Sequence, residues 1–149
     1  AGGRRDLPVG VGASATVAKT IAECDSYGFA GITGDFAPPH LNEEFMKSAQ
    51  YGQRVAHGAL LVGFMSTASA LLANRIIEAT PGITPMSIGY DRIRFIGPVL
   101  IGDTVTVTYE VKEVEPERGR SYADLTATNQ RGETIGVGRH IMKWLENPA

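Results

Sequence analysis

Two side chains that can move protons stand close together in the 149-residue sequence. Asp35 and His40 lie at the two ends of the segment Asp35-Phe36-Ala37-Pro38-Pro39-His40. A carboxylate and an imidazole are suited to general acid–base catalysis at neutral pH. The two prolines have no N–H to donate and push the residues before them toward extended backbone, so we predict a stiff loop rather than a helix. The alternative is that Asp35 caps a turn and His40 starts the next helix.

The segment after this loop is apolar and uncharged. Residues 55–74 carry no formal charge when His57 is counted as neutral, and by length they could span a membrane. Eleven of the twenty residues are Gly, Ala, Ser, Thr or Asn, the segment stands alone, and the chain beyond it has the pattern of a soluble sheet. We therefore interpret it as a long central helix that is buried on nearly all sides.

Shorter elements precede this helix. The β-branched residues of 15–21 predict a first strand. A short helix is expected to start at Asp25 or Ser26, to run through Ile32 and to end at Gly34. A second short helix is expected to be capped by Asn42 and ended by Gly52. Its inward-facing residues are predicted to be Phe45, Met46 and Ala49.

The second half of the chain has the pattern of an antiparallel sheet. Predicted strands cover residues 87–96, 104–112, 121–128 and 134–144. A bulge is expected near Asp91 and Arg92, where the alternation changes phase, and turns are expected at 115–119 and 130–132. The sequence therefore predicts one α+β domain over residues 1–149, an antiparallel sheet wrapped around a long central helix. Residues 1–8 are expected to be disordered or a non-native extension.

Composition narrows the class of protein. The formal charge of −2 and a pI near 5.9 give no reason to expect binding to nucleic acid or to a membrane surface. Cys24 is the single cysteine, which excludes an intramolecular disulfide and a multi-thiolate metal site and favours a cytoplasmic location. We do not expect the first residues to form a signal peptide, since no apolar run follows them.

Three motifs together point to a known family. They are residues 29–40, residues 55–60 with the run Ala56-His57-Gly58, and residues 95–104 with Gly97-Pro98 and Gly102-Asp103. This combination resembles the MaoC-like (R)-specific enoyl-CoA hydratases, which have the hot-dog fold, and the resemblance covers nearly the whole chain. The family pattern D-x-N-P-x-H is kept at Asp35, Pro38 and His40. This sequence differs from the pattern at Ala37, where the family usually has Asn.

The resemblance implies a reversible addition of water to a trans-2-enoyl thioester, which gives an (R)-3-hydroxyacyl-CoA. Asp35 and His40 would hold the water, with Asp35 as the base and His40 as the group that orients the water and passes a proton to Cα. The sequence does not separate these two roles. The backbone N–H of Gly58, in the first turn of the long helix, is the expected donor to the thioester oxyanion. The other interpretation of Gly58 is close helix–sheet packing.

A structural interpretation also fits three other polar residues, Ser66, His57 and His140. Ser66 lies eight residues after Gly58, on a similar helix face, and a serine here lies near the catalytic pair in the family. It could equally bond its own helix backbone. His57 is interpreted as structural and His140 as a satisfied strand histidine. Because the three histidines lack metal-ligand spacing, we expect no metal, and no cofactor beyond the CoA of the substrate. A homodimer or larger oligomer is expected.

Two other functions remain open at this level. A hot-dog thioesterase would share the fold and the CoA thioester, but such enzymes commonly carry a carboxylate on the long helix, and residues 55–74 have none. The acyl-carrier-protein dehydratases of this fold also place an acid there, so the same observation counts against them. A non-catalytic acyl-CoA-binding module is disfavoured because both Asp35 and His40 are present.

Overall fold

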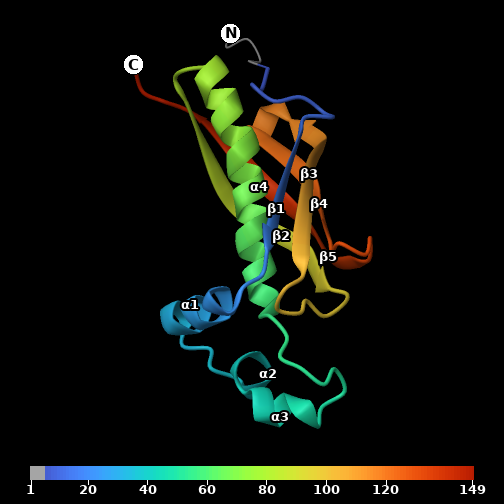
Figure 1. Ribbon diagram of the computed structural model, residues 1–149. Coiled ribbons are helices and arrows are strands. Elements are labelled where there is room, and N and C mark those ends of the chain that lie inside the picture. The colour runs from blue at the N-terminus through green and yellow to red at the C-terminus, as the bar shows by residue number, and fades with distance from the viewer. Residues whose placement is uncertain (1–5) are drawn as a thin grey trace.

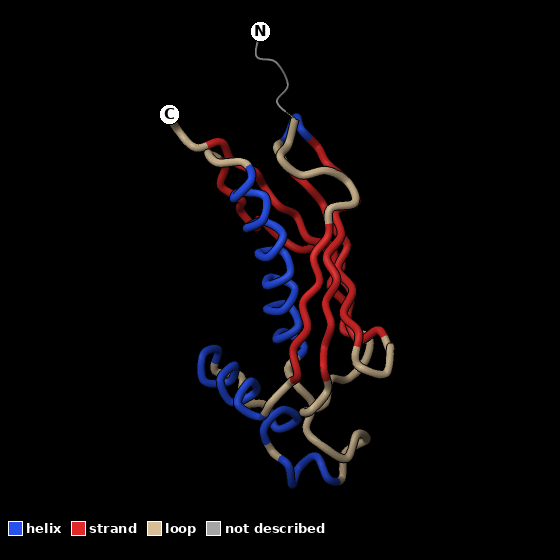
Figure 2. Tube along the Cα trace, turned by 45° about the horizontal axis from the view of Figure 1, so that its top comes forward, coloured by secondary structure: helices blue, strands red, loops and turns tan. Residues whose placement is uncertain are grey.

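The computed structural model describes residues 6–149 and shows one antiparallel sheet packed against one long helix. The helix, α4 (Gly58–Ala79), crosses one face of the sheet (Figures 1 and 2). The strand order is β1-β3-β4-β5-β2. The strands are β1 (Ser14–Thr20), β2 (Ile83–Phe95), β3 (Thr104–Glu115), β4 (Arg120–Thr128) and β5 (Thr134–Glu146). The predicted α+β architecture is confirmed.

The strand alternation decides which face of the sheet is buried. On β3, Val105, Val107, Tyr109 and Val111 are at most 2% exposed, and the intervening threonines lie on the other face. Successive side chains of a strand point to opposite faces, so this period of two places every second residue toward α4. The turn predicted after β3 is a short 3-10 helix, Pro116–Arg118, ended by Gly119 at φ 63°.

Helix α4 differs from its predicted range at both ends. It begins at Gly58 rather than at residue 55, because Val55 pairs with Leu100 and the Ala56 N–H donates to the Val99 carbonyl. It continues past Asn74 to Ala79. The predicted burial on nearly all sides is wrong for this single chain, in which one face is buried. The buried face is formed by Leu61, Met65, Ala68, Ser69, Leu72 and Ala73.

By length and composition α4 would pass as a membrane span, with a mean hydropathy of 1.5 over its most apolar window. Its packing accounts for this composition. The buried side chains of α4 meet those of the sheet in one continuous hydrophobic core. A helix that serves as the core of a domain has the same need for apolar residues as one that lies in lipid.

Strand β2 lies at one edge of the sheet and contains the predicted bulge. Its pairing with β5 shifts register between Ser87 and Gly89 and again between Asp91 and Arg94. Arg92 takes the left-handed backbone conformation, with φ 55°. Each shift inserts an unpaired residue and changes which side chains share a face. Ser87 and Tyr90 are therefore both paired with residues of β5 that face inward, Met142 and His140.

Three short helices lie beyond the N-terminal end of α4 (Figure 1). They are α1 (Glu23–Thr33), α2 (Pro38–Leu41) and α3 (Glu43–Lys47). The predicted start of α1 at Asp25 or Ser26 is wrong, because Asp25 is instead the third helical residue and accepts the Ala22 N–H at 2.8 Å. Its end at Gly34, with φ 83°, is confirmed.

The predictions for α2 and α3 are partly confirmed. His40 does not lie in a non-helical loop, since a single helical turn begins at Pro38, where a missing N–H costs nothing. Asn42 caps α3 as predicted, and its side chain accepts the Phe45 N–H at 2.9 Å. Met46 is buried, whereas Phe45 is 53% exposed and does not face inward.

Arg54 ties these helices to the segment that leads into α4. Its Nε donates to Glu43 on α3 at 2.6 Å, and Nη1 donates to the Tyr27 hydroxyl on α1 at 2.9 Å. A third contact joins Nη2 to Glu23. These charge-assisted bonds raise the pKa of Arg54, the contact with Glu23 most of all. The guanidinium thus holds two helices and the start of α4 in one arrangement.

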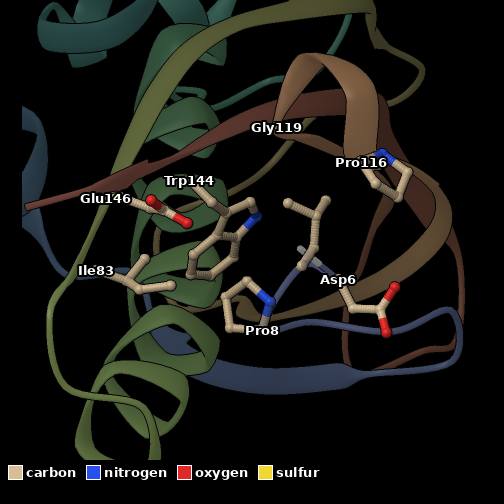
Figure 3. Close-up of a pocket in the computed structure, with 8 residues that line it drawn as sticks. Asp6, Pro8, Ile83, Pro116, Gly119, Trp144 and Glu146 are labelled. Atoms are coloured by element: carbon tan, nitrogen blue, oxygen red, sulfur yellow. The ribbon is translucent and has the colours of Figure 1, made fainter. Parts of the chain in front are cut away.

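The N-terminal segment packs onto the opposite end of the molecule. Leu7 contacts the hydrophobic core and Val9 is 6% exposed, so the expected disorder is wrong for residues 6–8. Residues 1–5 lie outside the described part of the chain. A hollow of about 380 Å³ at this end is lined by Asp6, Leu7, Pro8, Ile83, Pro116, Gly119, Trp144 and Glu146 (Figure 3). Its lining includes Ile83, which follows the C-terminal end of α4, whereas Asp35 is bonded to His57 at the N-terminal end of that helix.

Candidate active site

Asp35, His40 and His57 meet at the N-terminal end of α4. One side-chain ligand atom of each residue lies within 4.8 Å of the corresponding atoms of the other two. Asp35 comes from the loop after α1, His40 from α2, and His57 is the residue immediately before α4. The predicted proximity of Asp35 and His40 is therefore present, and a third group joins them.

Local hydrogen bonds hold the Asp35 loop. The Ala37 N–H donates to the Asp35 carboxylate at 3.2 Å, and the Asp35 N–H donates to the Thr33 hydroxyl at 3.2 Å. The first of these is an Asx turn, in which an aspartate side chain substitutes for a backbone acceptor. Because Ala37 takes part through its backbone, this turn does not need the Asn that the family usually has here. Asp35 itself is exposed to solvent.

The hydrogen bond of His40 identifies its tautomer. Nδ1 lies 2.9 Å from the Val55 carbonyl oxygen. A carbonyl only accepts hydrogen bonds, so Nδ1 must carry the proton in the neutral ring. Nε2 is then left with its lone pair, and it is the nitrogen that can accept and return a proton. The same loop is bound a second time, since the Val55 N–H donates to the Pro39 carbonyl at 3.0 Å.

Gly58 is the first residue of α4. Its N–H has no partner within the helix, because the first four N–H groups of a helix never do. A Cβ at this position would lie 2.7 Å from Cδ2 of Phe95, so a side chain here would displace the Phe95 ring from the helix start. This position thus combines close packing against Phe95 with an N–H that has no partner within the helix. The predicted role as an oxyanion donor is compatible with this geometry.

Ser66 is not brought into contact with Asp35 or His40 in the described structure. It lies on α4 about 12 Å beyond Gly58 along the helix axis, given a rise of about 1.5 Å per residue. Its neighbour is Tyr90 of β2. Burial raises the pKa of Tyr90, and hydrogen bonds with the hydroxyls of Ser66 and Ser87 oppose that rise. The predicted role of Ser66 near the catalytic pair stays a prediction.

His140 is a satisfied strand histidine, as predicted. It is fully buried, with Nε2 at 2.7 Å from the Ser87 hydroxyl and Nδ1 at 2.8 Å from the Tyr109 hydroxyl. Burial lowers its pKa to about 4. It therefore stays neutral at physiological pH and belongs to the core beneath β2.

His57, interpreted from the sequence as structural, lies within the candidate site. In the structure its Nε2 lies 3.0 Å from the Asp35 backbone oxygen, and its ring stacks on His40 with centroids 4.0 Å apart. The signal that was available is its position directly before Gly58. A residue before the first turn of a helix lies beside the free N–H groups of that helix.

Asp35, His40 and His57 also have the composition of a metal site. A carboxylate and two imidazoles are ligands that Zn²⁺ and Fe²⁺ accept. One nitrogen of each imidazole is hydrogen-bonded to a backbone carbonyl, and metal-bound histidines also donate their other ring N–H in this way. The cluster therefore fits either proton transfer or a three-ligand cation site, and the two are separable by experiment.

Comparison with known proteins identifies the family. A family model described as "MaoC like domain" matches residues 8–131. The (R)-specific enoyl-CoA hydratase of Rhodospirillum rubrum is 41% identical over 107 residues, which is 72% of this chain and 69% of that protein. The 3-hydroxybutyryl-CoA dehydratase of Methylorubrum extorquens is 39% identical over 130 residues, covering 87% and 75%.

A solved structure supports the same family assignment. An R-hydratase from Pseudomonas aeruginosa superposes with a TM-score of 0.70 at 29% identity, over 95% of this chain and 88% of that one. The hot-dog fold implied by the sequence motifs is thereby confirmed. The chain belongs to the MaoC-like family.

Proposed function

We propose that the protein hydrates trans-2-enoyl-CoA thioesters to (R)-3-hydroxyacyl-CoA and catalyses the reverse dehydration. The observation that carries this proposal is the approach of the Asp35 carboxylate and the His40 imidazole to within 4.8 Å of each other beside the first N–H groups of α4. The relatives named as an (R)-specific enoyl-CoA hydratase and a 3-hydroxybutyryl-CoA dehydratase support the same reaction.

The reaction needs two proton transfers. Water must lose a proton as it attacks Cβ, and Cα must gain one. The Asp35 carboxylate is the base that takes the proton from water. Nε2 of His40 carries no hydrogen while Nδ1–H is held by the Val55 carbonyl, so it can orient the water, receive the proton from Asp35 and deliver that proton to Cα. If both groups lie on one side of the bound substrate, water adds to a single face of the double bond. The product is then a single enantiomer.

The thioester oxygen becomes negative as Cβ is attacked. A backbone N–H at a helix N-terminus, where the helix dipole is also positive, stabilises such a charge. Gly58 offers this N–H from the residue next to His57, so the base and the oxyanion donor are held on adjoining parts of one small site. Ser66, further along α4, is proposed to contact the substrate.

The reaction requires no cofactor, because CoA enters as part of the substrate. We also propose that the protein works as a homodimer or larger oligomer. Edge strand β2 leaves Met86, Ile88 and Phe95 between 46% and 52% exposed. An unpaired edge with apolar side chains is normally covered by another chain. A cytoplasmic location is expected from the single exposed cysteine, Cys24.

One assay separates the candidate functions. Crotonyl-CoA is mixed with the protein while the absorbance of the enoyl thioester and the concentration of free thiol are followed together. Hydration bleaches the enoyl chromophore and releases no thiol. A thioesterase would release thiol, and an acyl-CoA-binding module would change neither signal, so either result would overturn the proposal.

A further inference from the structure

His57 contacts both members of the acid–base pair, although it is only 2% exposed and the reaction scheme above assigns it no role. Its Nε2 lies 3.0 Å from the backbone oxygen of Asp35. Its ring lies 4.0 Å from the His40 ring, at an interplanar angle of 29°, and 4.7 Å from the ring of Phe29. One buried side chain therefore joins α1, the Asp35 loop, α2 and the start of α4.

The protonation of His57 follows from these contacts. The Asp35 carbonyl only accepts a hydrogen bond, so Nε2 carries the hydrogen. Nδ1 is buried and has no hydrogen-bond partner among the described residues. A proton on Nδ1 would therefore be buried and unpaired, which is unfavourable. His57 therefore donates through Nε2–H and, within the described part of the chain, leaves Nδ1 unbonded.

We infer that His57 is a positioning residue for the acid–base pair: its Nε2–H fixes the Asp35 peptide, and its ring packs against the His40 imidazole. This inference rests on the function proposed above. Asp35 is then held at its N–H by Thr33, at its carboxylate by Ala37 and at its carbonyl by His57. Because His57 directly precedes Gly58, the same bond sets the distance between the base and the oxyanion donor.

Two substitutions separate the hydrogen bond from the packing. H57F keeps an aromatic ring against His40 and Phe29 but removes the N–H. H57Q loses the ring but places an amide N–H where Nε2 was. We expect H57F to lower kcat for crotonyl-CoA hydration by about 10- to 100-fold with KM changed less than about twofold, since a small misplacement of a catalytic group has this effect. H57Q should recover most of the lost kcat.

F29L is the matched control, because it alters packing on the same imidazole without touching the hydrogen bond, and it should change kcat by less than about threefold. The double variant D35N/H57F tests whether His57 affects catalysis through Asp35. If His57 acts through Asp35, H57F should add nothing to the defect of D35N. A multiplied defect, or an H57Q variant as impaired as H57F, would overturn the inference.

If H57F does not fold, the inference can still be tested on the wild-type protein without substrate. Long-range ¹H–¹⁵N spectra of the labelled wild-type imidazoles should show the Nε2–H tautomer for His57 and the Nδ1–H tautomer for His40. The Nδ1–H tautomer at His57 would overturn the inference. A wild type that hydrates no enoyl-CoA would overturn the proposed function and this inference with it, whereas a hydrating wild type and a folded H57F with normal kcat would overturn this inference alone.

Discussion

The Tyr109 hydroxyl lies 2.8 Å from Nδ1 of His140 in the core between the sheet and α4. Burial raises the pKa of Tyr109 and lowers that of His140 to about 4. Both ring nitrogens of His140 are hydrogen-bonded, Nδ1 with the Tyr109 hydroxyl and Nε2 with the Ser87 hydroxyl. Because burial disfavours the charged imidazolium, the folded state is coupled to pH.

Stability should therefore fall as the pH is lowered from about 6.5 to 4. The unfolded chain binds a proton at His140 near its ordinary pKa of 6.5, whereas the folded chain does not bind it until about pH 4. Protons thus favour unfolding across this window, by up to about 3 kcal/mol for a shift of this size. Urea unfolding at pH 7.5 and at pH 4.5 measures the loss.

The control for this prediction is H140Q, which keeps a donor and an acceptor but does not titrate. Other groups titrate in both proteins, so the difference between the two pH profiles isolates His140. We expect the wild type to lose more free energy of unfolding than H140Q between these pH values. Parallel profiles for the two proteins would show that His140 is not the group responsible.

Replacing His40 by alanine should remove most of the hydratase activity and leave the fold intact. A positioned acid or base contributes about 10²–10⁴ in rate. The side chain is only partly buried, and its loss removes one hydrogen bond to Val55 and a ring stack, so the cost in stability should be on the order of 1 kcal/mol. The measurements are kcat with crotonyl-CoA and a thermal melt, with E44Q on α3 as a surface control. Near-normal turnover by folded H40A would remove His40 from the mechanism.

Replacing Asp35 by asparagine should abolish hydration while enoyl-CoA still binds. Asparagine has the same shape and keeps the oxygen that accepts the Ala37 N–H, so the loop should keep its conformation. What it lacks is the basic oxygen, and kcat should fall by about 10²–10⁴ in both directions of the reaction. If Asp35 only capped a turn, asparagine would cap it nearly as well and the activity would be retained.

The measurement is kcat for crotonyl-CoA beside the dissociation constant for the same ligand. D91N is the matched control, because Asp91 is an exposed aspartate on β2. A fall in kcat of about tenfold or less would show that Asp35 is not the base. The mechanism would then have to be built on His40 alone.

The protein should be a dimer or larger at micromolar concentration by light scattering. The exposed apolar side chains of edge strand β2 are the surface that pairing would bury. I88K places a charge on that edge and should shift the protein toward the monomer, because burying an unpaired ammonium is unfavourable. V11K, at a similarly exposed valine on the turn before β1, is the control. A monomeric wild type would contradict the prediction.

Removal of metal should leave the activity unchanged. Proton transfer between Asp35, water and His40 needs no Lewis acid, so protein dialysed against EDTA should keep its kcat. Added Zn²⁺ should inhibit, because the side chains of Asp35, His40 and His57 can converge on one ion. Loss of activity on dialysis and its recovery with a divalent metal would show instead that this cluster is a functional metal site.

Local patterns in the sequence were sufficient to predict the sheet and the proximity of Asp35 and His40. The alternation of β3, the Asn42 cap and the Gly34 stop each depend on neighbours along the chain, so they could be predicted directly. The approach of Asp35 to His40 follows from five intervening peptide bonds and two prolines. The one-turn helix at Pro38 was missed because proline also fits the first turn of a helix.

Contacts between distant segments were decided only by the tertiary structure. The bond from His57 to the Asp35 carbonyl spans 22 positions, and the pair of Ser87 with His140 spans 53. Helix α4 starts at Gly58 because Val55 forms a β-bridge with Leu100. The helix propensities of the residues near Val55 do not predict this pairing. Such contacts depend on which faces pack together in three dimensions, and a one-dimensional pattern of apolar and polar residues does not specify that packing.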